Sequence, residues 1–314
     1  MSHRLIRAAL ALCLTATLAA PAQPQQRGRL LQQWMAKRAA AADADAPAVP
    51  APRTLAFGAD ARQALDYWPA ATGAKAPPLI VFVHGGAWSM GDKSNGTGRW
   101  KPAHFTAAGY AFASLDYRLV PQVKVEDEAA DVAHGVRWLR DHAVELGFDP
   151  ARVVLMGHSA GAHLVALVGT DERYLKDAGL SFASLKGVIP IDGAGYDVAR
   201  QMAGDAPRLL QQRYQAAFGS DPARQRALSP TLRAADGAGR LPPFLLIHVQ
   251  RPDAVAQAEG LEAALKAARA RVERQGFAGE GLSGHLEINR RLGDPAYPAT
   301  GVVDGWLLAR FTQR

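Results

Sequence analysis

The feature that most constrains the fold of this 314-residue chain is the pentapeptide Gly-His-Ser-Ala-Gly at residues 157–161. A short β-branched run at residues 153–156 precedes it, and an apolar stretch at residues 162–169 follows it. A strand, a G-x-S-x-G turn and a helix together describe a nucleophile elbow, which holds a serine hydroxyl exposed at the C-terminal edge of a sheet. Glycines are needed on both sides because side chains there would clash in so tight a turn. The pattern predicts that Ser159 is a nucleophile.

A second motif, His84-Gly85-Gly86, follows the apolar run at residues 78–83, which has the length and composition of a buried parallel strand. One glycine pair alone would indicate an ordinary tight turn. In acyl transfer, however, the carbonyl oxygen gains charge, and backbone N–H groups aimed at it stabilise that charge. The N–H groups of Gly85 or Gly86, together with that of Ala160, would form such an oxyanion hole. The two motifs jointly indicate acyl-transfer chemistry.

Five stretches of the chain stand in the order found in the α/β-hydrolase superfamily. They are His84-Gly85-Gly86-Ala87-Trp88, Gly91-Asp92-Lys93, Asp116-Tyr117-Arg118-Leu119, residues 157–163 and His285. The chain resembles this superfamily from about Arg53 to its end. More narrowly, it resembles bacterial carboxylesterases related to kynurenine formamidase and to feruloyl-esterase-like hydrolases. The hormone-sensitive-lipase branch has a third glycine where Ala87 stands, which favours the formamidase-like branch.

The resemblance implies an α/β fold with a mostly parallel central sheet flanked by helices. The strand-then-helix rhythm of the sequence favours the same architecture. Expected strands, of which the first two form a hairpin, are residues 54–57, 65–68, 79–83, 111–115, 153–156, 188–191, 244–247 and a last one near 272. Expected helices are residues 129–146, 160–169, 257–268 and 302–311. The long excursion at residues 196–241 predicts a small helical cap.

The general base is sought among three histidines, because this fold places its catalytic residues in the order serine, acid, histidine. His163 lies one helical turn beyond the serine and is expected to pack beside the elbow. His248 ends a predicted strand and is expected to shape the following loop. His285 sits in a Gly/Ser-rich loop, residues 279–284, with a helical segment behind it. We predict that His285 is the general base.

The acid is predicted to be Asp253, because the family places this residue in the loop after the penultimate strand. The glycine that usually follows His248 is replaced by Val249, and Pro252 stiffens the approach. Asp192 and Glu280 are the alternatives. The resulting Ser159–His285–Asp253 triad would cleave a small-molecule ester through an acyl-enzyme.

Trp88 and Tyr196 are predicted to contact the substrate, an ester of a small or aromatic acyl group, because their segments start at sheet edges near the serine. The alternatives are hydrolysis of an N-formyl amide, acyl transfer or peptide hydrolysis on the same scaffold, and a hydrolase-fold protein that only binds. No cofactor and no metal are expected, since neither a nucleotide-binding glycine loop nor a His-Glu-x-x-His motif occurs.

The N-terminus has the three-part layout of a secretory signal peptide over residues 1–22. Arg4 and Arg7 precede the apolar residues 8–20, and Ala20-Pro21-Ala22 offers a cleavage site. The apolar stretch is shorter than the roughly 20 residues that span a bilayer, so no stable membrane insertion is expected after cleavage; an uncleaved anchor is the alternative. Residues 23–53 are predicted to be an N-terminal extension and an Ala/Pro-rich linker, and residues 54–314 the hydrolase domain. The expected location is the periplasm or the exterior.

Composition agrees with a globular enzyme, with 48% hydrophobic and 21% charged residues. The single cysteine, Cys13, lies in the predicted signal peptide, so no disulfide is expected in the mature chain. The formal net charge of +7 comes from scattered arginines and lysines interleaved with acidic residues. Nucleic acid is therefore not an expected partner.

Overall fold

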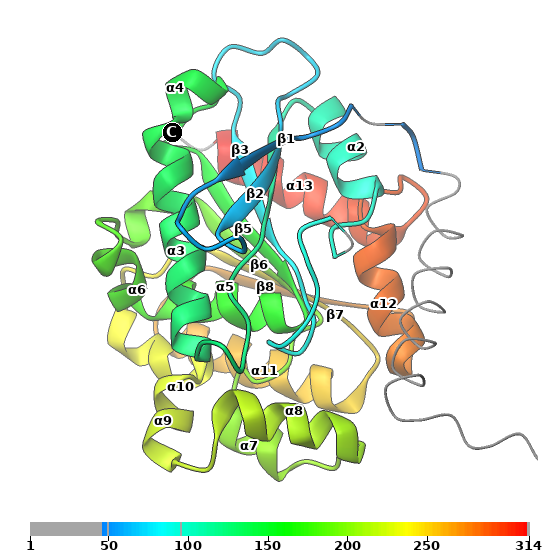
Figure 1. Cartoon of the computed structure of the whole chain (residues 1–314). Helices are drawn as coiled ribbons and strands as arrows, with labels where there is room; N and C mark the ends of the chain where they lie inside the picture. Colours follow the sequence, from blue (N-terminus) through cyan, green and yellow to red (C-terminus); the bar gives the residue numbers. More distant parts are fainter. Residues whose placement is uncertain (1–45, 49, 95, 313–314) are drawn as a thin grey trace, which may run out of the picture. The chain divides into compact units, whose positions relative to one another are not determined.

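An eight-stranded sheet lies at the centre of the computed structural model, which describes residues 46–48, 50–94 and 96–312. The strands follow one another in the spatial order β1-β2-β4-β3-β5-β6-β7-β8 (Figure 1). Strand β2 is antiparallel to both β1 and β4, and all the other pairs are parallel. The strands are β1 (Arg53–Ala56), β2 (Ala64–Trp68), β3 (Leu79–Val83), β4 (Ala111–Leu115), β5 (Val153–His158), β6 (Gly187–Ile191), β7 (Phe244–Val249) and β8 (Val272–Phe277).

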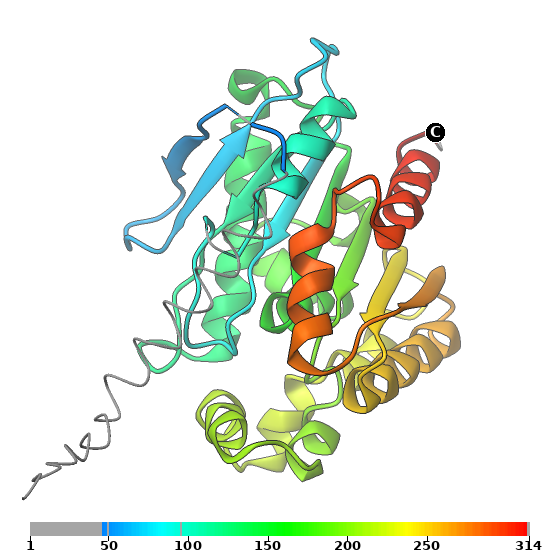
Figure 2. The ribbon, with the colours of Figure 1, turned by 90° about the vertical axis from the view of Figure 1, so that its right-hand side faces the viewer.

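Helices connect the strands and pack on both faces of the sheet (Figures 1 and 2). In chain order they are α2 (Trp100–Ala107), α3 (Val125–Asp141), α4 (Ala143–Leu146), α5 (Ala160–Thr170), α6 (Glu172–Asp177), the 3-10 helix η1 (Phe182–Ser184), α7 (Val198–Ala203), α8 (Arg208–Phe218), α9 (Pro222–Ala227), α10 (Pro230–Arg233), the 3-10 helix η2 (Ala234–Gly237), α11 (Pro252–Ala267), α12 (Gly281–Arg291) and α13 (Pro298–Thr312).

Strand β3 shows why the inner strands read as unbroken apolar runs. Successive side chains of a strand point to opposite faces of its sheet. Leu79, Val81 and Val83 pack into the cluster formed with α3, α5 and α11. Ile80 and Phe82 pack into the other cluster, formed with α2, α12 and α13. Because both faces are covered, every position of the strand is buried, as is usual for parallel sheets.

The register of the parallel strands gathers their carboxyl ends at one edge of the sheet. Val83 at the end of β3 pairs with Gly157 of β5. His158 of β5 pairs with Ile191 of β6, which in turn pairs with Ile247 of β7. The loops that follow β3, β5, β6 and β7 therefore start side by side. In open α/β sheets this edge is where ligands bind.

The insertion between β6 and β7 is helical and consists of α7, α8, α9, α10 and η2. Figures 1 and 2 place α7 and α8 beyond the carboxyl ends of the strands. Trp88, in the loop after β3, packs its ring 4.7 Å from that of Phe218 and 6.0 Å from that of Tyr214, both on α8. The cap predicted at residues 196–241 thus contacts the loop that carries the His-Gly-Gly motif.

The predicted hairpin and inner strands are confirmed within a few residues at their ends. The helix expected at residues 129–146 differs, because it starts earlier and divides into α3 and α4 at His142. The predicted signal peptide lies outside the described residues, as does most of the extension at residues 23–53. In the described part of the chain, no helix is both long and apolar enough to cross a membrane.

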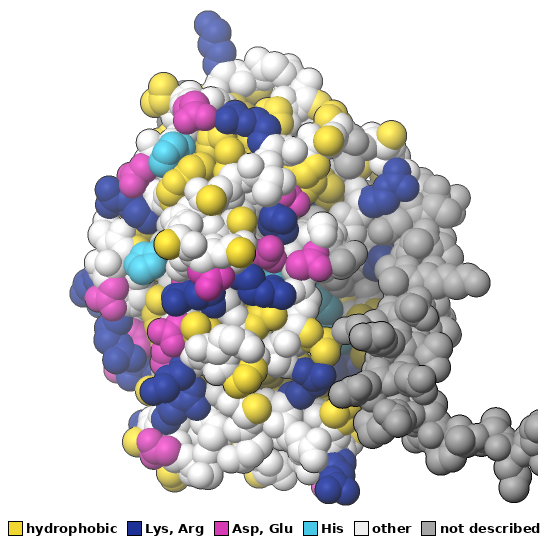
Figure 3. Space-filling model, in the orientation of Figure 1, with side chains coloured by type: hydrophobic (Ala, Val, Ile, Leu, Met, Phe, Trp, Pro, Cys, Tyr) yellow, Lys and Arg dark blue, Asp and Glu magenta, His cyan; other side chains and the backbone are white. Residues whose placement is uncertain are grey.

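Charged side chains of both signs are interspersed on the face seen in Figure 3. Exposed ion pairs occur along helices of the described chain, as between Arg137 and Asp141 at 2.7 Å. Exposed pairs of this kind contribute little to stability, typically about 0–1 kcal/mol each. Among the described residues of this face, no continuous patch of one charge is seen (Figure 3).

Candidate active site

Ser159 occupies a sharp turn between β5 and α5. Its backbone adopts φ 57° and ψ −117°, which is uncommon for a residue with a side chain. A Cβ atom on Gly157 would lie 2.4 Å from the carbonyl oxygen of Gly161, and one on Gly161 would lie 2.2 Å from that of Val83. Only glycine allows these approaches, so the elbow predicted from the pentapeptide is confirmed in its backbone geometry.

His285 links the serine to a carboxylate. The hydroxyl of Ser159 donates to Nε2 of His285 at 3.0 Å, and Nδ1–H of His285 donates to Oδ2 of Asp192 at 2.6 Å. Both distances are within the reach needed for proton transfer and for orientation of the ring. The three side chains come from three parts of the chain, the β5–α5 turn, the loop after β6 and helix α12, and they meet at one sheet edge.

The position of His285 corrects one expectation. Only residues 279 and 280 of the Gly/Ser-rich segment precede α12; residues 281–284 form the first turn of this helix and not a loop. Gly284 of this helix must be a glycine, because a Cβ there would lie 2.6 Å from the backbone carbon of Gly279. The glycines reflect close packing of two backbone segments, which the sequence does not distinguish from a flexible loop.

The carboxylate that meets His285 is Asp192 and not the predicted Asp253. Asp253 lies in the first turn of α11 with its side chain 45% exposed, where it pairs with Arg251 at 3.4 Å. Asp192 follows β6 directly, with φ 45° and a side chain fully shielded from solvent. The loop after β7 turns into α11 at Pro252, which carries Asp253 towards the surface. Glu280, the other alternative, is the residue before α12.

Asp192 is held as an anion despite its burial. Burial acts to raise its pKa, but the hydrogen bond from His285, the charges of His285 and Arg251 and the backbone N–H of Val249 outweigh burial and lower the pKa to about 2. An ionised Asp192 accepts from Nδ1–H of His285 and leaves Nε2 free to accept the serine proton. This is the tautomer that a general base requires.

The predicted oxyanion loop lies against the nucleophile. A Cβ atom on Gly85 would lie 2.9 Å from the Cβ of Ser159 and 2.9 Å from the carbonyl oxygen of His158. Gly86 has φ 137°, and a Cβ there would lie 1.9 Å from the carbonyl oxygen of Met90. Ala160 is the first residue of α5, where backbone N–H groups have no intrahelical acceptor. The structure thus brings the Gly85–Gly86 backbone, Ala160 and Ser159 together.

With this geometry described, comparison with known proteins defines the family. The sequence pattern of the BD-FAE family matches residues 65–264, well over half of the chain. The chain belongs to the BD-FAE family. The match starts in β2 and ends in α11, so it includes the elbow, the His-Gly-Gly loop and Asp192.

Several curated proteins to which this BD-FAE chain is similar carry esterase names. It is 31% identical over 245 residues to esterase LipC of Mycobacterium tuberculosis, covering 75% of this chain and 58% of LipC. It is 28% identical over 207 residues to the probable isoprenylcysteine alpha-carbonyl methylesterase ICMEL1 of Arabidopsis thaliana, covering 62% of this chain and 43% of the relative. The chain therefore spans about half the length of the curated relatives it matches.

Solved structures show the same fold over most of the BD-FAE chain. Esterase B from Lactobacillus Rhamnosis superposes with a TM-score of 0.71 at 23% identity, covering 91% of this chain and 93% of the esterase. Esterase 2 of Thermogutta terrifontis gives a TM-score of 0.65 at 25% identity, covering 84% and 94%. The α/β-hydrolase fold and the resemblance to its carboxylesterase branch, both predicted from sequence, are confirmed.

Trp88 and Tyr196, predicted to contact the substrate, are both buried. Trp88 is 1% exposed, and its Nε1–H donates to Nδ1 of His163 at 3.2 Å. Tyr196 is 2% exposed, and its hydroxyl lies where a Cβ on Gly193 would approach it to 2.2 Å. Both side chains support the loops around the serine, and their contact with substrate stays a prediction.

Helix α12 is fixed in place by polar contacts that the sequence analysis did not single out. His158 donates from Nε2 to the carbonyl oxygen of His285 at 2.9 Å, and the two rings lie 4.4 Å apart. Burial, and then the charge of His285, lower the pKa of His158 well below its usual range, which keeps this ring neutral. Lys101 on α2 is fully buried and donates to the carbonyl oxygens of Thr97 and Asn289. His158 lies inside the Gly-His-Ser-Ala-Gly pentapeptide, and this position next to Ser159 is the sequence feature from which its role could have been predicted.

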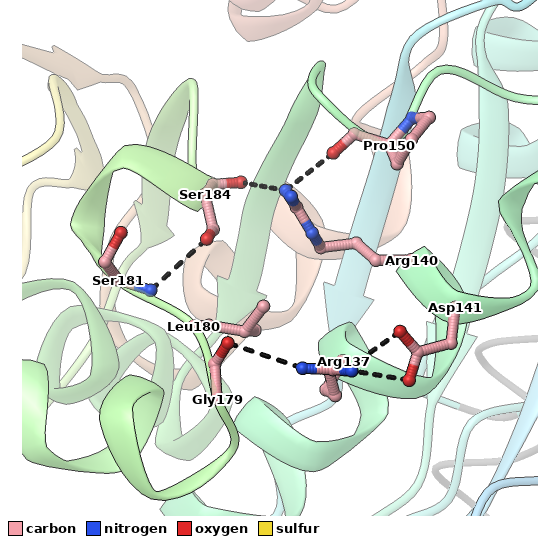
Figure 4. Close-up of a pocket in the computed structure, with 8 residues that line it drawn as sticks. All are labelled: Arg137, Arg140, Asp141, Pro150, Gly179, Leu180, Ser181 and Ser184. Carbon is pink, nitrogen blue, oxygen red and sulfur yellow. Dashed lines mark hydrogen bonds and ion pairs between the residues drawn. The ribbon is translucent and has the colours of Figure 1, made fainter.

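A surface hollow of about 550 Å³ lies away from this site, between α3 and the segment around η1 (Figure 4). Its two arginines are already engaged. Arg140 donates to the carbonyl oxygens of Pro150 and Ser184, and Arg137 pairs with Asp141. Both arginines of the hollow are thus engaged with groups of the protein itself.

Proposed function

We propose that this protein is a carboxylic ester hydrolase that works through a Ser159–His285–Asp192 triad and an acyl-enzyme. The observation that carries the proposal is the continuous hydrogen-bond chain from the Ser159 hydroxyl through His285 to Asp192. Its location at the carboxyl ends of β5 and β6 supports the same conclusion, as do the esterase relatives.

In the proposed reaction, His285 takes the proton of Ser159 at Nε2 as the serine oxygen attacks the ester carbon. Ionised Asp192 stabilises the resulting imidazolium through Nδ1–H. The imidazolium then gives its proton to the leaving alcohol, which departs as the acyl-enzyme forms. A water molecule repeats the sequence, with His285 again as the base, and releases the acid and free Ser159.

The negative oxygen of each tetrahedral intermediate would be held by backbone N–H groups of Gly85 or Gly86 and of Ala160. The proximity of Gly85 to Ser159 supports this assignment. Each such donor is worth about 10²–10³ in rate. Because backbone groups supply these donors, the site needs no charged side chain at this position.

The substrate is proposed to be an ester with a small or aromatic acyl group, met outside the cytoplasm after export by the N-terminal signal. The names of the relatives, an esterase and a probable methylesterase, support an ester over an amide. Cleavage of an N-formyl amide is the competing activity. A hydrolase-fold protein that only binds is less well supported, because the serine and histidine are within hydrogen-bonding distance.

The test is hydrolysis of p-nitrophenyl esters with acyl chains of two to twelve carbons, beside an N-formyl aromatic amide, by the purified protein and its Ser159→Ala variant. We expect ester cleavage that falls by several orders of magnitude in the variant. A fluorophosphonate probe should label Ser159, as read by mass spectrometry. Equal hydrolysis by folded Ser159→Ala protein would refute the proposal, and formyl-amide cleavage alone would reassign the substrate. Detection of the mature chain in the periplasm or medium, starting near Gln23, tests export.

A further inference from the structure

Arg251 occupies the loop after β7, the loop in which the sequence predicted the acid. Its Nε–H donates to Oδ2 of Asp192 at 2.9 Å, and this oxygen also accepts from Nδ1–H of His285 at 2.6 Å. A second nitrogen of the guanidinium lies 3.4 Å from the main-chain oxygen of Asp192. The side chain of Arg251 is 16% exposed and that of Asp192 is fully buried, so the pair is largely shielded from solvent.

The same strand end supplies a second contact to this carboxylate. The backbone N–H of Val249 donates to Oδ1 of Asp192 at 3.1 Å. Both oxygens are therefore held from the β7 side, one by a backbone group and one by a charged side chain. These contacts fix the plane of a carboxylate whose own backbone is in the left-handed region, with φ 45°.

We propose that Arg251 is a positioning residue for the triad, which orients Asp192 and moderates the negative charge that Asp192 presents to His285. This inference rests on the proposed function of Ser159, His285 and Asp192. Arg251 does not touch the reacting atoms and acts only through Asp192.

The physical argument concerns the oxygen that Arg251 and His285 share. A guanidinium at 2.9 Å offsets part of the charge of the carboxylate, so the imidazolium form of His285 is stabilised less than by Asp192 alone. Arg251 thus opposes positive charge on the His285 ring, which must be neutral to accept the serine proton. The arginine therefore extends activity towards acidic pH while it holds the carboxylate in line with Nδ1.

The other charged or titratable groups near the His285–Asp192 pair are left in place when Arg251 is changed. Asp253 lies on the outer side of Arg251 at 3.4 Å and is 45% exposed, so it is a weak and screened partner. The others are His158 on β5, Tyr196 after β6 and Tyr297 before α13, each of which interacts electrostatically with Asp192, and Lys101 on α2, which acts on His158.

The experiment compares Arg251→Gln, Arg251→Lys and Asp253→Asn with the unaltered protein. Glutamine retains a hydrogen-bond donor without the charge, and lysine retains the charge without the planar fork. The measurements are kcat and KM for a short p-nitrophenyl ester across pH 4–9, together with the pH dependence of the NMR signals of the His285 ring. Circular dichroism and thermal melting establish that each variant is folded.

For Arg251→Gln we expect the acid limb of the kcat/KM profile, and the midpoint of the His285 NMR titration, to move up by about one pH unit. The value of kcat should fall about tenfold to a hundredfold with KM little changed, because a neutral glutamine amide makes a weaker hydrogen bond to Asp192 than the charged guanidinium does. Arg251→Lys should keep the wild-type acid limb while kcat falls. Asp253→Asn should match the unaltered protein within about twofold, as expected for an exposed pair.

An unchanged acid limb and NMR midpoint in folded Arg251→Gln protein would overturn the inference, even if kcat fell, because Arg251 would then be merely structural. If Arg251→Gln does not fold, Arg251→Lys decides, and a moved acid limb with the charge retained would overturn it. Absence of serine-dependent hydrolysis in the unaltered protein would refute the proposed function instead. The NMR titration would still test whether Arg251 governs the Asp192–His285 pair.

Discussion

Replacing Asp192 by asparagine removes the carboxylate that accepts from His285, Arg251 and Val249 while keeping the shape of the side chain. An amide has only one acceptor oxygen. If its NH₂ group faces His285, Nδ1 must accept, so the proton moves to Nε2 and the ring can no longer take the serine proton. If its oxygen faces His285, the NH₂ group meets the backbone N–H of Val249.

Two magnitudes follow for Asp192→Asn. The pKa of Asp192 is about 2 against an ordinary 3.8, and each pKa unit corresponds to about 1.4 kcal/mol. Because the folded pKa is the lower one, the ionised carboxylate stabilises the fold by about 2 kcal/mol above pH 4, a contribution lost as the pH falls towards 2. The variant should lose about that free energy of unfolding at pH 7. Its kcat should fall by about 10⁴, the size found when a triad carboxylate becomes an amide.

The assay is ester hydrolysis at pH 7.5, with urea unfolding followed by circular dichroism. Asp253→Asn is the matched control, because it makes the same chemical change on a half-exposed side chain that does not contact His285. Its kcat should stay within about twofold of the unaltered protein. If Asp253→Asn abolished activity and Asp192→Asn retained it, the carboxylate identified here would be the wrong one.

Three further predictions concern the packing around the site. Gly85→Ala should lower kcat more than tenfold in a folded protein, since its Cβ would come within 2.9 Å of the Cβ of Ser159 and distort the oxyanion loop; wild-type kcat would contradict this. Gly301→Ala, on α13 with nothing within 4 Å of the new Cβ, should keep kcat and raise the free energy of unfolding by up to about 1 kcal/mol in urea titrations; a loss of stability would show that the site is less open than described. Burial, partly offset by the backbone hydrogen bond to Leu228, lowers the pKa of His163 from 6.5 to about 4. As the pH falls, the unfolded chain therefore binds this proton before the folded protein does. Up to about 3 kcal/mol of the free energy of unfolding is lost between pH 6.5 and 4. Urea unfolding at pH 7.5 and 5 should show a smaller loss for His163→Gln, and an equal loss in both proteins would contradict the role assigned to this ring.

The sheet was predictable from sequence because its inner strands are buried on both faces. The apolar run that forms β3 has no helical period, which indicates a strand, and the His-Gly-Gly motif after it indicates where the strand ends. The elbow was marked in the same way by two glycines at fixed offsets from Ser159. In each case the sequence pattern is local, and a local pattern can be interpreted without knowledge of the tertiary structure.

The carboxylate that meets His285 could not be predicted in the same way. Asp192 and Asp253 each follow the carboxyl end of a strand, β6 and β7, and either could in principle face His285. The choice depends on Asp192 adopting a positive φ and on the β7 loop turning early into α11 at Pro252. Both are set by tertiary packing and not by any spacing in the sequence. The first turn of α12 was missed for a related reason, since glycines that permit close packing resemble glycines of a loop.

The glycines at the two ends of the elbow also bear on how such an enzyme could change its substrate. Gly161 lies against the carbonyl oxygen of Val83, and Gly157 lies against that of Gly161, so main chain touches main chain across the reactive centre. The distance between the serine and the His-Gly-Gly loop is therefore set by backbone atoms. Substitutions of side chains elsewhere in the protein do not change these backbone contacts. The helices between β6 and β7 are an insertion on this frame. Residues of α7 and α8 can therefore vary without changing the backbone contacts that position Ser159.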